Sequence, residues 1–229
     1  MESNSISPTV PTISVIIPMY RAVPLVAEAI ASIQAQTVAV TCIIAVEDGP
    51  SDGSADFVES RFPDVYVVRK PHGGLADTLN HGLAEVRTEL VAFLDHDDRW
   101  LPRKTEQQLA ALAQHPELDM VFGQAERFIS SPEGERVVDV LPGVAKSGGL
   151  FRVAAFQRAG KFGDGHDFLD WYARAMEAGL RHKVLPEVIY QRRIHENNLG
   201  VTGKSEQTKS YLTTLKAMLD RRRDAAGPR

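Results

Sequence analysis

The sequence predicts an α/β fold in which a central, mainly parallel β-sheet is flanked by helices. Short apolar runs alternate with segments of helical periodicity over the first half of the chain. These apolar runs are nearly continuous, which is typical of parallel strands buried on both faces. The chain has 229 residues, of which 43% are hydrophobic and 24% are charged, so it can bury a substantial core as a soluble globular protein.

The first half contains four predicted strands and two clear helices. Each strand is a short apolar run rich in β-branched residues, and each helix repeats apolar residues at spacings of three or four. The strands are 12–18, 41–46, 65–68 and 90–94, and the helices are 25–33 and 75–87. Polar, turn-rich sequence follows the first, second and fourth strands. Because parallel strands end at one edge of a sheet, we expect these polar segments to meet where ligands bind.

The second half follows a different pattern. Residues 120–129 and 135–141 flank "SSPEG" and predict a hairpin, and the Gly-rich stretch 141–149 predicts a mobile loop. The remaining predicted elements are helices at 150–159, 167–178 and 205–223 and a strand at 183–195. We interpret the change near residue 115 as a border between two lobes that share one sheet within a single domain, 1–229.

Composition restricts the functions to be considered. The net charge of −4 provides no overall basic field of the kind that drives nucleic-acid binding. The single cysteine, Cys42, lies in an apolar run and is interpreted as a buried structural residue, and a chain without a disulfide suits a reducing cytoplasm. The start lacks the pattern of a signal peptide, and no apolar run has the length of a membrane span. We therefore expect a cytoplasmic protein, at most peripheral at the inner membrane face.

The fourth strand runs into "DHDD", which contains Asp95, Asp97 and Asp98. Carboxylates this close raise each other's pKa unless a cation neutralises them. Their oxygens suit Mg²⁺ or Mn²⁺, which one or two carboxylates often share with substrate phosphates. The alternative interpretation is a solvated strand end at which Asp97 or Asp98 caps the next helix.

Two neighbouring loops carry further polar groups. "EDGPSDGS" places Glu47 and Asp48 at the end of the second strand, although an ordinary strand-to-helix turn capped by Asp52 or Ser54 would have the same sequence. "PHGG" places Gly73 and Gly74 before a helix, where exposed backbone N–H groups could face an anion.

Together these segments resemble family 2 glycosyltransferases. The resemblance rests on "ISVIIPMYRAVPLVAEAIASIQAQ", "IIAVEDGPSDGS", "PHGGLADTLNHGL" and "ELVAFLDHDDRWLPRKTEQQ", which stand in the family's order and spacing. It covers residues 12–114 well and continues loosely to about 200. It implies an A-type glycosyltransferase fold (GT-A), with a nucleotide-sugar-binding lobe at 12–114, an acceptor and catalytic lobe at 115–200, and a lid and C-terminal helix at 201–229.

The resemblance also implies roles for individual residues. Pro18 and Tyr20 would line the nucleotide pocket together with Glu47, Asp48 and Gly74, and an aspartate of the acidic pair would contact the base. Asp95 would face the ribose and Asp97 would ligate Mg²⁺ or Mn²⁺, with His96 between them in the nucleotide-sugar site and Asp98 as support. The chain departs from the common pattern at several positions, because Arg21 stands where Asn is frequent, Glu47 and Pro50 replace Asp and Ser, and Leu79 precedes Asn80 where Arg is common.

The catalytic base of the family comes from an acidic motif at the start of a helix after a Gly-rich loop. Here that place holds "GDGHDFLDWYARAMEAGL", in which His166 stands where Glu is frequent, and two alignments make Asp167 or Asp170 the base. Trp171 could stack on a sugar ring, but a core position is the commoner case for a tryptophan.

The family often has a late Arg-x-His element over the diphosphate. Strand alternation places Arg193 and His195 on one face and Arg192 on the other, so we assign Arg193 to the diphosphate and His195 to the diphosphate or the metal ion. An exposed edge strand with solvated arginines is the alternative.

The sequence therefore predicts an inverting, metal-dependent glycosyltransferase with a nucleotide-diphosphate sugar as donor, UDP being the expected nucleotide. The acceptor would be a peptide, a metabolite or a lipid-linked glycan, and the C-terminal helix could form a homodimer. Two alternatives are a non-catalytic nucleotide-sugar-binding protein and a sugar nucleotidyltransferase. The absence of glycine from "PMYRAVP" after the first strand argues against the nucleotidyltransferase.

Overall fold

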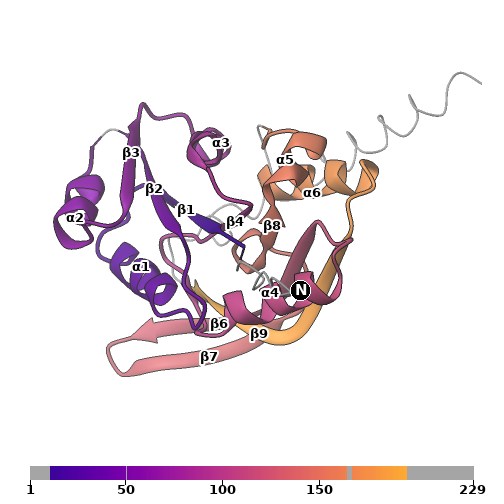
Figure 1. Ribbon diagram of the computed structural model, residues 1–229. Coiled ribbons are helices and arrows are strands. Elements are labelled where there is room, and N and C mark those ends of the chain that lie inside the picture. The colour runs from indigo at the N-terminus through magenta and orange to yellow at the C-terminus, as the bar shows by residue number, and fades with distance from the viewer. Residues whose placement is uncertain (1–10, 50, 164–166, 195–229) are drawn as a thin grey trace, which may run out of the picture.

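A single nine-stranded sheet organises the protein (Figure 1). The computed structural model describes residues 11–49, 51–163 and 167–194. Eight strands follow one another in the order β3-β2-β1-β4-β8-β6-β9-β5, and β7 pairs with β6 beside this path. The predicted α/β class with a mainly parallel sheet flanked by helices is confirmed. Both halves of the chain contribute strands to the one sheet, and the border predicted near residue 115 falls between α4 and β6.

The first half builds the parallel part of the sheet. Its strands β1, β2, β3 and β4 are Ile13–Met19, Cys42–Asp48, Tyr66–Lys70 and Leu90–Phe93. β1 pairs in parallel with β2 and β4, and β2 pairs in parallel with β3. The side chains of β1 are buried throughout, as the continuous apolar run predicted. The carboxyl ends of these four strands lie at the same edge of the sheet, and the predicted polar segments follow three of them.

Helices cover both faces of the sheet (Figure 1). One hydrophobic core packs α1, α2 and α4 on one face, and a second core packs α3, α5 and α6 on the other. Alternate residues of β1 divide between the two cores, since Val15 and Ile17 belong to the first and Ile16 to the second. The helices are α1 Val26–Gln34, α2 Ser54–Arg61, α3 Leu75–Glu85, α4 Lys104–Gln114, α5 Val153–Ala159 and α6 Asp167–Glu177.

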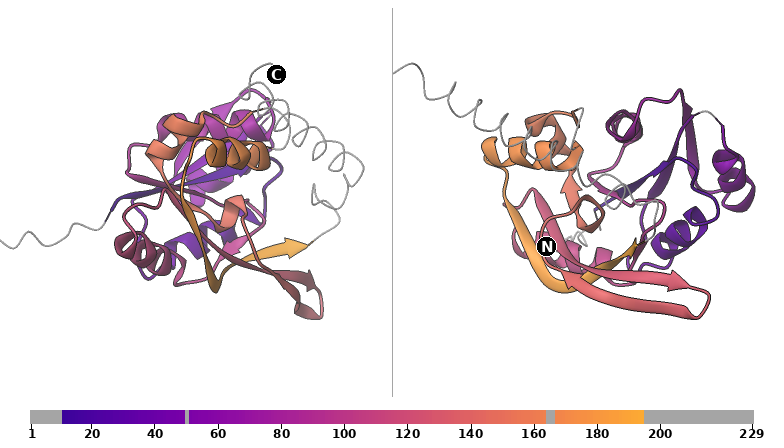
Figure 2. Two further views of the ribbon diagram at one scale, coloured as in Figure 1. Left: turned by 90° about the vertical axis from the view of Figure 1, so that its right-hand side faces the viewer. Right: turned by 180° about the vertical axis from the view of Figure 1, so that it is seen from behind.

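The second half completes the sheet with antiparallel and mixed pairs. Its strands β6 to β9 are Met120–Ser131, Gly134–Leu141, Leu150–Arg152 and His182–Ile194, and they are joined by the short strand β5, Arg99–Trp100, from the first half. β6 and β7 form the predicted antiparallel hairpin, which projects from the body in both figures (Figures 1 and 2). β8 runs antiparallel to β4 and β6, whereas β9 runs parallel to β6 and antiparallel to β5.

Two predictions for the segment 141–159 were wrong in detail. Residues 146–149 do not form an exposed part of a mobile loop, because the 3₁₀ turn η1, Lys146–Gly148, is buried. The predicted helix at 150–159 divides into β8 and α5, since residues 150–152 pair with β4. The predicted lid and the helix at 205–223 lie outside the described residues. No described helix has the length and apolar character needed to cross a membrane.

Candidate active site

The acidic motif Asp95–Asp98 forms a turn immediately after β4. A backbone bond of 3.1 Å from the Asp98 N–H to the Asp95 carbonyl closes the turn. Both carboxylate oxygens of Asp95 accept hydrogen bonds, from Lys146 Nζ at 2.5 Å and from Ser147 Oγ at 3.3 Å. Asp98 is buried, and its Oδ1 accepts the backbone N–H of Arg193 at 3.0 Å. The turn therefore joins β4, η1 and β9 at the carboxyl edge of the sheet.

Asp95 and Asp98 experience different electrostatic surroundings. Burial acts to raise the pKa of Asp95, but the charge and hydrogen bond of Lys146 outweigh it and hold that pKa below its usual range. Burial raises the pKa of Asp98 well above its usual range, and the negative charges of Asp95 and Asp97 raise it further. The surroundings of Asp98 therefore disfavour its ionised form.

This arrangement fits a cation that takes most of its ligands from a substrate. No group of three or more His, Cys, Asp or Glu within residues 11–49, 51–163 and 167–194 is placed to hold a metal ion. Mg²⁺ and Mn²⁺ are often held by one or two carboxylates together with substrate phosphates and water. Asp97 is half-buried in this acidic turn and could offer a carboxylate oxygen to such an ion. The predicted second ligand, His195, lies outside the described residues.

Asp48, at the end of β2, is the centre of a second polar cluster. Its Oδ1 accepts Lys70 Nζ at 2.6 Å and the Gly73 N–H at 2.8 Å. Its Oδ2 accepts the Gly74 N–H at 3.0 Å and lies 3.0 Å from His72 Nδ1. The paired glycine amides therefore face a carboxylate of the protein itself. Asp48 holds the loop between β3 and α3 against the end of β2.

The pKa values of this cluster follow from the same contacts. Burial acts to raise the pKa of Asp48, but the hydrogen bonds from Lys70, Gly73 and Gly74 lower it below its usual range. Burial acts to lower the pKa of Lys70, but Asp48 and Asp77 raise it above its usual range. At neutral pH the cluster is therefore a buried ion pair whose lysine also lies 2.7 Å from Asp77.

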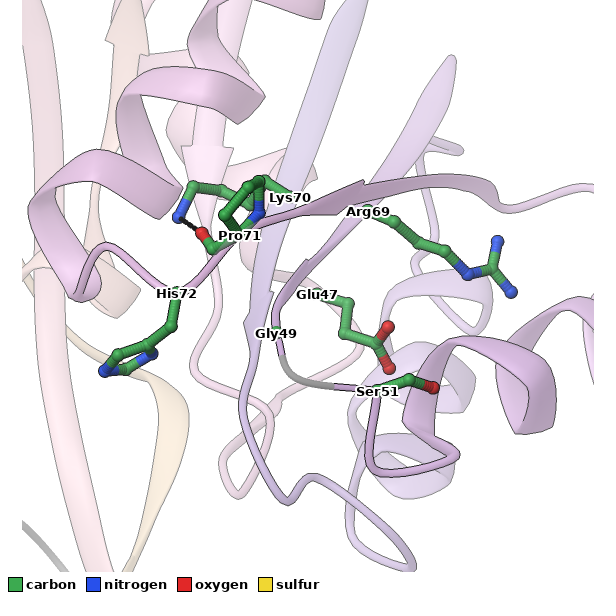
Figure 3. Close-up of a pocket in the computed structure, with 7 residues that line it drawn as sticks. All are labelled: Glu47, Gly49, Ser51, Arg69, Lys70, Pro71 and His72. Carbon is green, nitrogen blue, oxygen red and sulfur yellow. Dashed lines mark hydrogen bonds between the residues drawn. The ribbon is translucent and has the colours of Figure 1, made fainter.

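Glu47 lies beside this cluster but has a different local role. Its buried carboxylate accepts the backbone N–H of Ala55 at 3.0 Å, in the first turn of α2, where a negative charge stabilises a helix N-terminus. Figure 3 shows the Glu47 side chain directed toward Ser51, while Arg69 and His72 extend to opposite sides. These residues line a pocket of about 540 Å³ at the ends of β2 and β3, together with Gly49, Lys70 and Pro71.

The loop after β1 brings an aromatic ring to the same edge. Pro18 is buried inside β1, where it pairs in register with Val46. Tyr20 is 44% exposed, and its ring centroid lies 5.4 Å from that of His72. The next residue, Arg21, has φ of 52° and places its guanidinium carbon 5.4 Å from the Tyr20 ring. Left-handed backbone is unusual for residues other than Gly, Asn and Asp, so Arg21 adopts a conformation that few side chains favour.

The two candidates for the catalytic base occupy the start of α6. Asp167 is the first residue of the helix, and its side chain lies outside what the structure describes. Asp170 is 22% exposed and accepts a bond of 2.9 Å from Arg174 Nε. Arg174 also donates to the Lys161 carbonyl at 2.6 Å, so the pair fixes α6 to the preceding loop. Trp171 is fully buried and stacks on Phe156 with centroids 4.4 Å apart, which makes it a core residue.

Arg193 is buried and held by groups of the protein. Its Nε donates to the Asp97 carbonyl at 3.1 Å, and its Nη2 donates to Glu28 Oε2 at 2.5 Å. Its Nη1 donates to Ser130 Oγ, and the guanidinium carbon lies 4.6 Å from the Phe128 ring. Arg193 therefore connects α1, the hairpin and the acidic turn through its hydrogen bonds, in addition to any contact with a ligand.

Arg192 occupies the opposite face of β9. It is exposed, and its guanidinium makes no hydrogen bond or ion pair with any residue that the structure describes. Its charge nevertheless acts on the acidic turn, because it lowers the pKa of both Asp95 and Asp98. Sequence reasoning missed Arg192 as a site residue, and it also missed Lys146, Ser147 and Lys70. Alternation placed the two arginines on opposite faces of β9, but it did not show which face lies toward the acidic turn.

A protein-family model described as glycosyl transferase family 2 matches residues 14–179. An uncharacterized glycosyltransferase of Rickettsia typhi is 34% identical over 121 residues, which are 53% of this chain and 37% of that protein. The chain thus spans well under two thirds of the length of this curated relative.

Solved structures share the fold at low identity. S. aureus TarS 1-349 in complex with UDP-GlcNAc superposes with a TM-score of 0.67 at 18% identity, covering 82% of this chain and 60% of that one. The mannosyltransferase PcManGT from Pyrobaculum calidifontis, in complex with GDP-Man and Mn2+, superposes with a TM-score of 0.71 at 18% identity. The superposition covers 92% of this chain and 64% of that one.

Proposed function

The chain belongs to glycosyl transferase family 2, and from this premise we propose that it is an inverting, metal-dependent glycosyltransferase that uses a nucleotide-diphosphate sugar. One observation carries the proposal: the Asp48 cluster and the acidic turn lie at the carboxyl edge of one parallel sheet, after β2 and β4. Ligands of open α/β sheets bind at this edge.

The base end of the donor would bind beside Asp48. Tyr20 supplies an exposed ring, and the pocket beside it has room for a nucleobase. All four acceptor positions of the Asp48 carboxylate are in use, and only the contact with His72, whose side chain is 59% exposed, is easily displaced. A base that displaces His72 gains one acceptor position on the Asp48 carboxylate. One acceptor position matches the single ring N–H of uracil better than the adjacent pair of N–H groups of guanine. We therefore propose UDP as the nucleotide.

The diphosphate would lie over the acidic turn. Asp95 would accept the ribose hydroxyls, and Asp97 would hold Mn²⁺ or Mg²⁺. When bound, such an ion neutralises charge that develops on the departing diphosphate. Arg192 is better placed than Arg193 to meet phosphate oxygens, because its guanidinium is exposed and already acts on Asp95 and Asp98.

The acceptor would approach from the side of α6. Its nucleophile attacks the anomeric carbon opposite the diphosphate, the bond from that carbon to the diphosphate oxygen breaks, and the acceptor proton passes to a carboxylate. We assign that carboxylate to Asp167. Asp170 is bonded to Arg174 and serves to position the helix, which makes it the weaker candidate. The acceptor would be a peptide, a metabolite or a lipid-linked glycan.

Donor binding and turnover test the proposal separately. Calorimetry with UDP and GDP, each with Mn²⁺, should give tighter binding for UDP, and UDP-sugars should release UDP in the presence of acceptor candidates. Asp97→Asn should reduce release at least a hundredfold, whereas Asp64→Asn, at an exposed position before β3, should behave as the wild type. Binding without release across a broad acceptor panel would favour the non-catalytic protein, and the absence of binding would refute the donor site.

A further inference from the structure

Buried side chains of β5 and α4 hold the turn at 146–149 in place. Three consecutive carbonyl oxygens of this turn accept hydrogen bonds from buried side chains of β5 and α4. The bonds run from Trp100 Nε1 to Ser147 at 3.2 Å, from Gln108 Nε2 to Gly148 at 2.9 Å, and from Lys104 Nζ to Gly149 at 3.2 Å. Lys104 is 1% exposed, and its Nζ lies 4.1 Å from the centre of the Trp100 ring. A turn anchored through three successive carbonyls has little freedom to move.

The glycines of the turn explain how closely it is enclosed. A Cβ on Gly149 would lie 2.2 Å from the Phe151 ring, and a Cβ on Gly148 would lie 2.9 Å from the Tyr190 ring. Only glycine lets the backbone lie this close to β8 and β9. The side chains of Lys146 and Ser147 therefore start from a fixed backbone position.

These two side chains meet Asp95, one at each carboxylate oxygen. Lys146 is 9% exposed, and its Nζ lies 2.5 Å from Oδ1, while Ser147 Oγ lies 3.3 Å from Oδ2. Each carboxylate oxygen accepts two hydrogen bonds. Lys146 and Ser147 thus leave one acceptor position on each oxygen, and the 39% exposure of the Asp95 side chain keeps these positions accessible. A pair of acceptors on one carboxylate suits two neighbouring hydroxyl groups.

We propose that Lys146 is a positioning residue of the donor site, with Ser147 as its partner. Lys146 acts through Asp95: it fixes the orientation of that carboxylate toward a vicinal diol, such as that of a ribose. Its fixed positive charge also offsets the negative charge of Asp95. A divalent cation would then need Asp97 as its one carboxylate ligand in the turn. This inference rests on the proposed function, because it needs a nucleotide at Asp95.

A double-mutant cycle tests whether Lys146 acts through Asp95. The readout is the dissociation constant, by calorimetry with Mn²⁺, of UDP or GDP, whichever the wild type binds more tightly. Lys146→Met and Asp95→Asn should each weaken binding about tenfold or more, because each removes a charge-assisted contact. The double variant should bind no more than about threefold more weakly than the poorer single variant, since both changes remove the same unit. Lys183→Met, at a half-buried lysine at the other end of β9, should leave binding unchanged.

The outcomes separate this inference from the proposed function. If the loss of affinity in the double variant equals the product of the two single losses, Lys146 contacts the ligand directly and the proposal is overturned. An unchanged affinity in Lys146→Met would also overturn it. Should Lys146→Met fail to fold, Ser147→Ala replaces it in the cycle, with an expected loss of about threefold that disappears in the Asp95→Asn background. A wild type that binds neither nucleotide would instead refute the proposed function, and this inference with it.

Discussion

The two adjacent arginines of β9 give a sharp test of the site, because the structure assigns them opposite tasks. Arg193→Met removes the donors to Asp97, Ser130 and Glu28. Arg192→Met removes an exposed guanidinium without a hydrogen bond or ion pair to any described residue. The two variants make the same chemical change on the same strand, so each serves as the matched control of the other.

The cost of losing Arg193 follows from its contacts. Two bonds to neutral oxygens contribute about 1 kcal/mol each. The ion pair with Glu28, whose side chain is 51% exposed, adds about 0.5–1 kcal/mol after screening by solvent. We therefore expect Arg193→Met to lower the free energy of unfolding by about 3 kcal/mol, or the melting temperature by about 6–12 °C. Arg192→Met should change the free energy of unfolding by less than about 0.5 kcal/mol.

Nucleotide binding should respond in the opposite order. Arg192→Met should weaken UDP binding about tenfold or more, because a charge-assisted contact to phosphate is lost. Urea unfolding and calorimetry on both variants provide the two measurements. Our assignment is refuted if Arg193→Met unfolds at the same urea concentration as the wild type and loses UDP binding while Arg192→Met binds normally. Arg193 would then be the diphosphate ligand that the family resemblance implies.

Two further predictions concern the base end of the site. Arg21→Asn should raise the free energy of unfolding by about 0.5–1 kcal/mol in urea titrations, because Asn accepts the left-handed backbone at φ of 52° more readily. A free energy of unfolding below that of the wild type would mean that the side chain of Arg21 stabilises the loop. The depressed pKa of Asp48 stabilises the native state above about pH 4, and this contribution is lost as pH falls through the folded-state pKa. Asp48→Asn should therefore cost about 2–3 kcal/mol at pH 7 and progressively less as the pH is lowered below about 4, and a cost that does not change with pH would contradict the ionic role.

Most of the fold was predictable because it rests on local periodicity. The strand expected at 12–18 is β1, Ile13–Met19, and the helix expected at 75–87 is α3, Leu75–Glu85. The elements that the sequence did not predict are short and depend on distant partners. β5 is two residues long and exists through pairing with β9, and η1 is buried by side chains from α4 and β5. Nothing within such a segment distinguishes it from a loop.

The site was predicted only in part, for a related reason. Acidic residues at the ends of β2 and β4 could be placed at one edge, because parallel strands share their direction. Their partners could not: Lys146 meets Asp95 from 51 positions further along the chain, in a stretch whose glycines predicted mobility. For Arg192 and Arg193, alternation gave two faces without saying which one is buried. The pairing of β6 with β9 contains register shifts near Gln124, so neither face could be followed from the start of the strand.

The distribution of cations supports our proposal that the acidic turn, and not the Asp48 cluster, binds the metal ion. Asp48 is balanced by Lys70 and by two glycine amides, and its pKa is depressed. Asp95 is balanced by Lys146. Burial first, and the charges of Asp95 and Asp97 second, raise the pKa of Asp98, so a further negative charge is unfavourable at this position. A diphosphate alone would be repelled from this end of the turn, and a divalent ion alone would find fewer than three ligands among the described residues. Each would supply what the other lacks, because the ion cancels the repulsion and the diphosphate completes the coordination. We therefore infer that donor and metal bind to this turn together, with Asp97 as their shared contact to the protein.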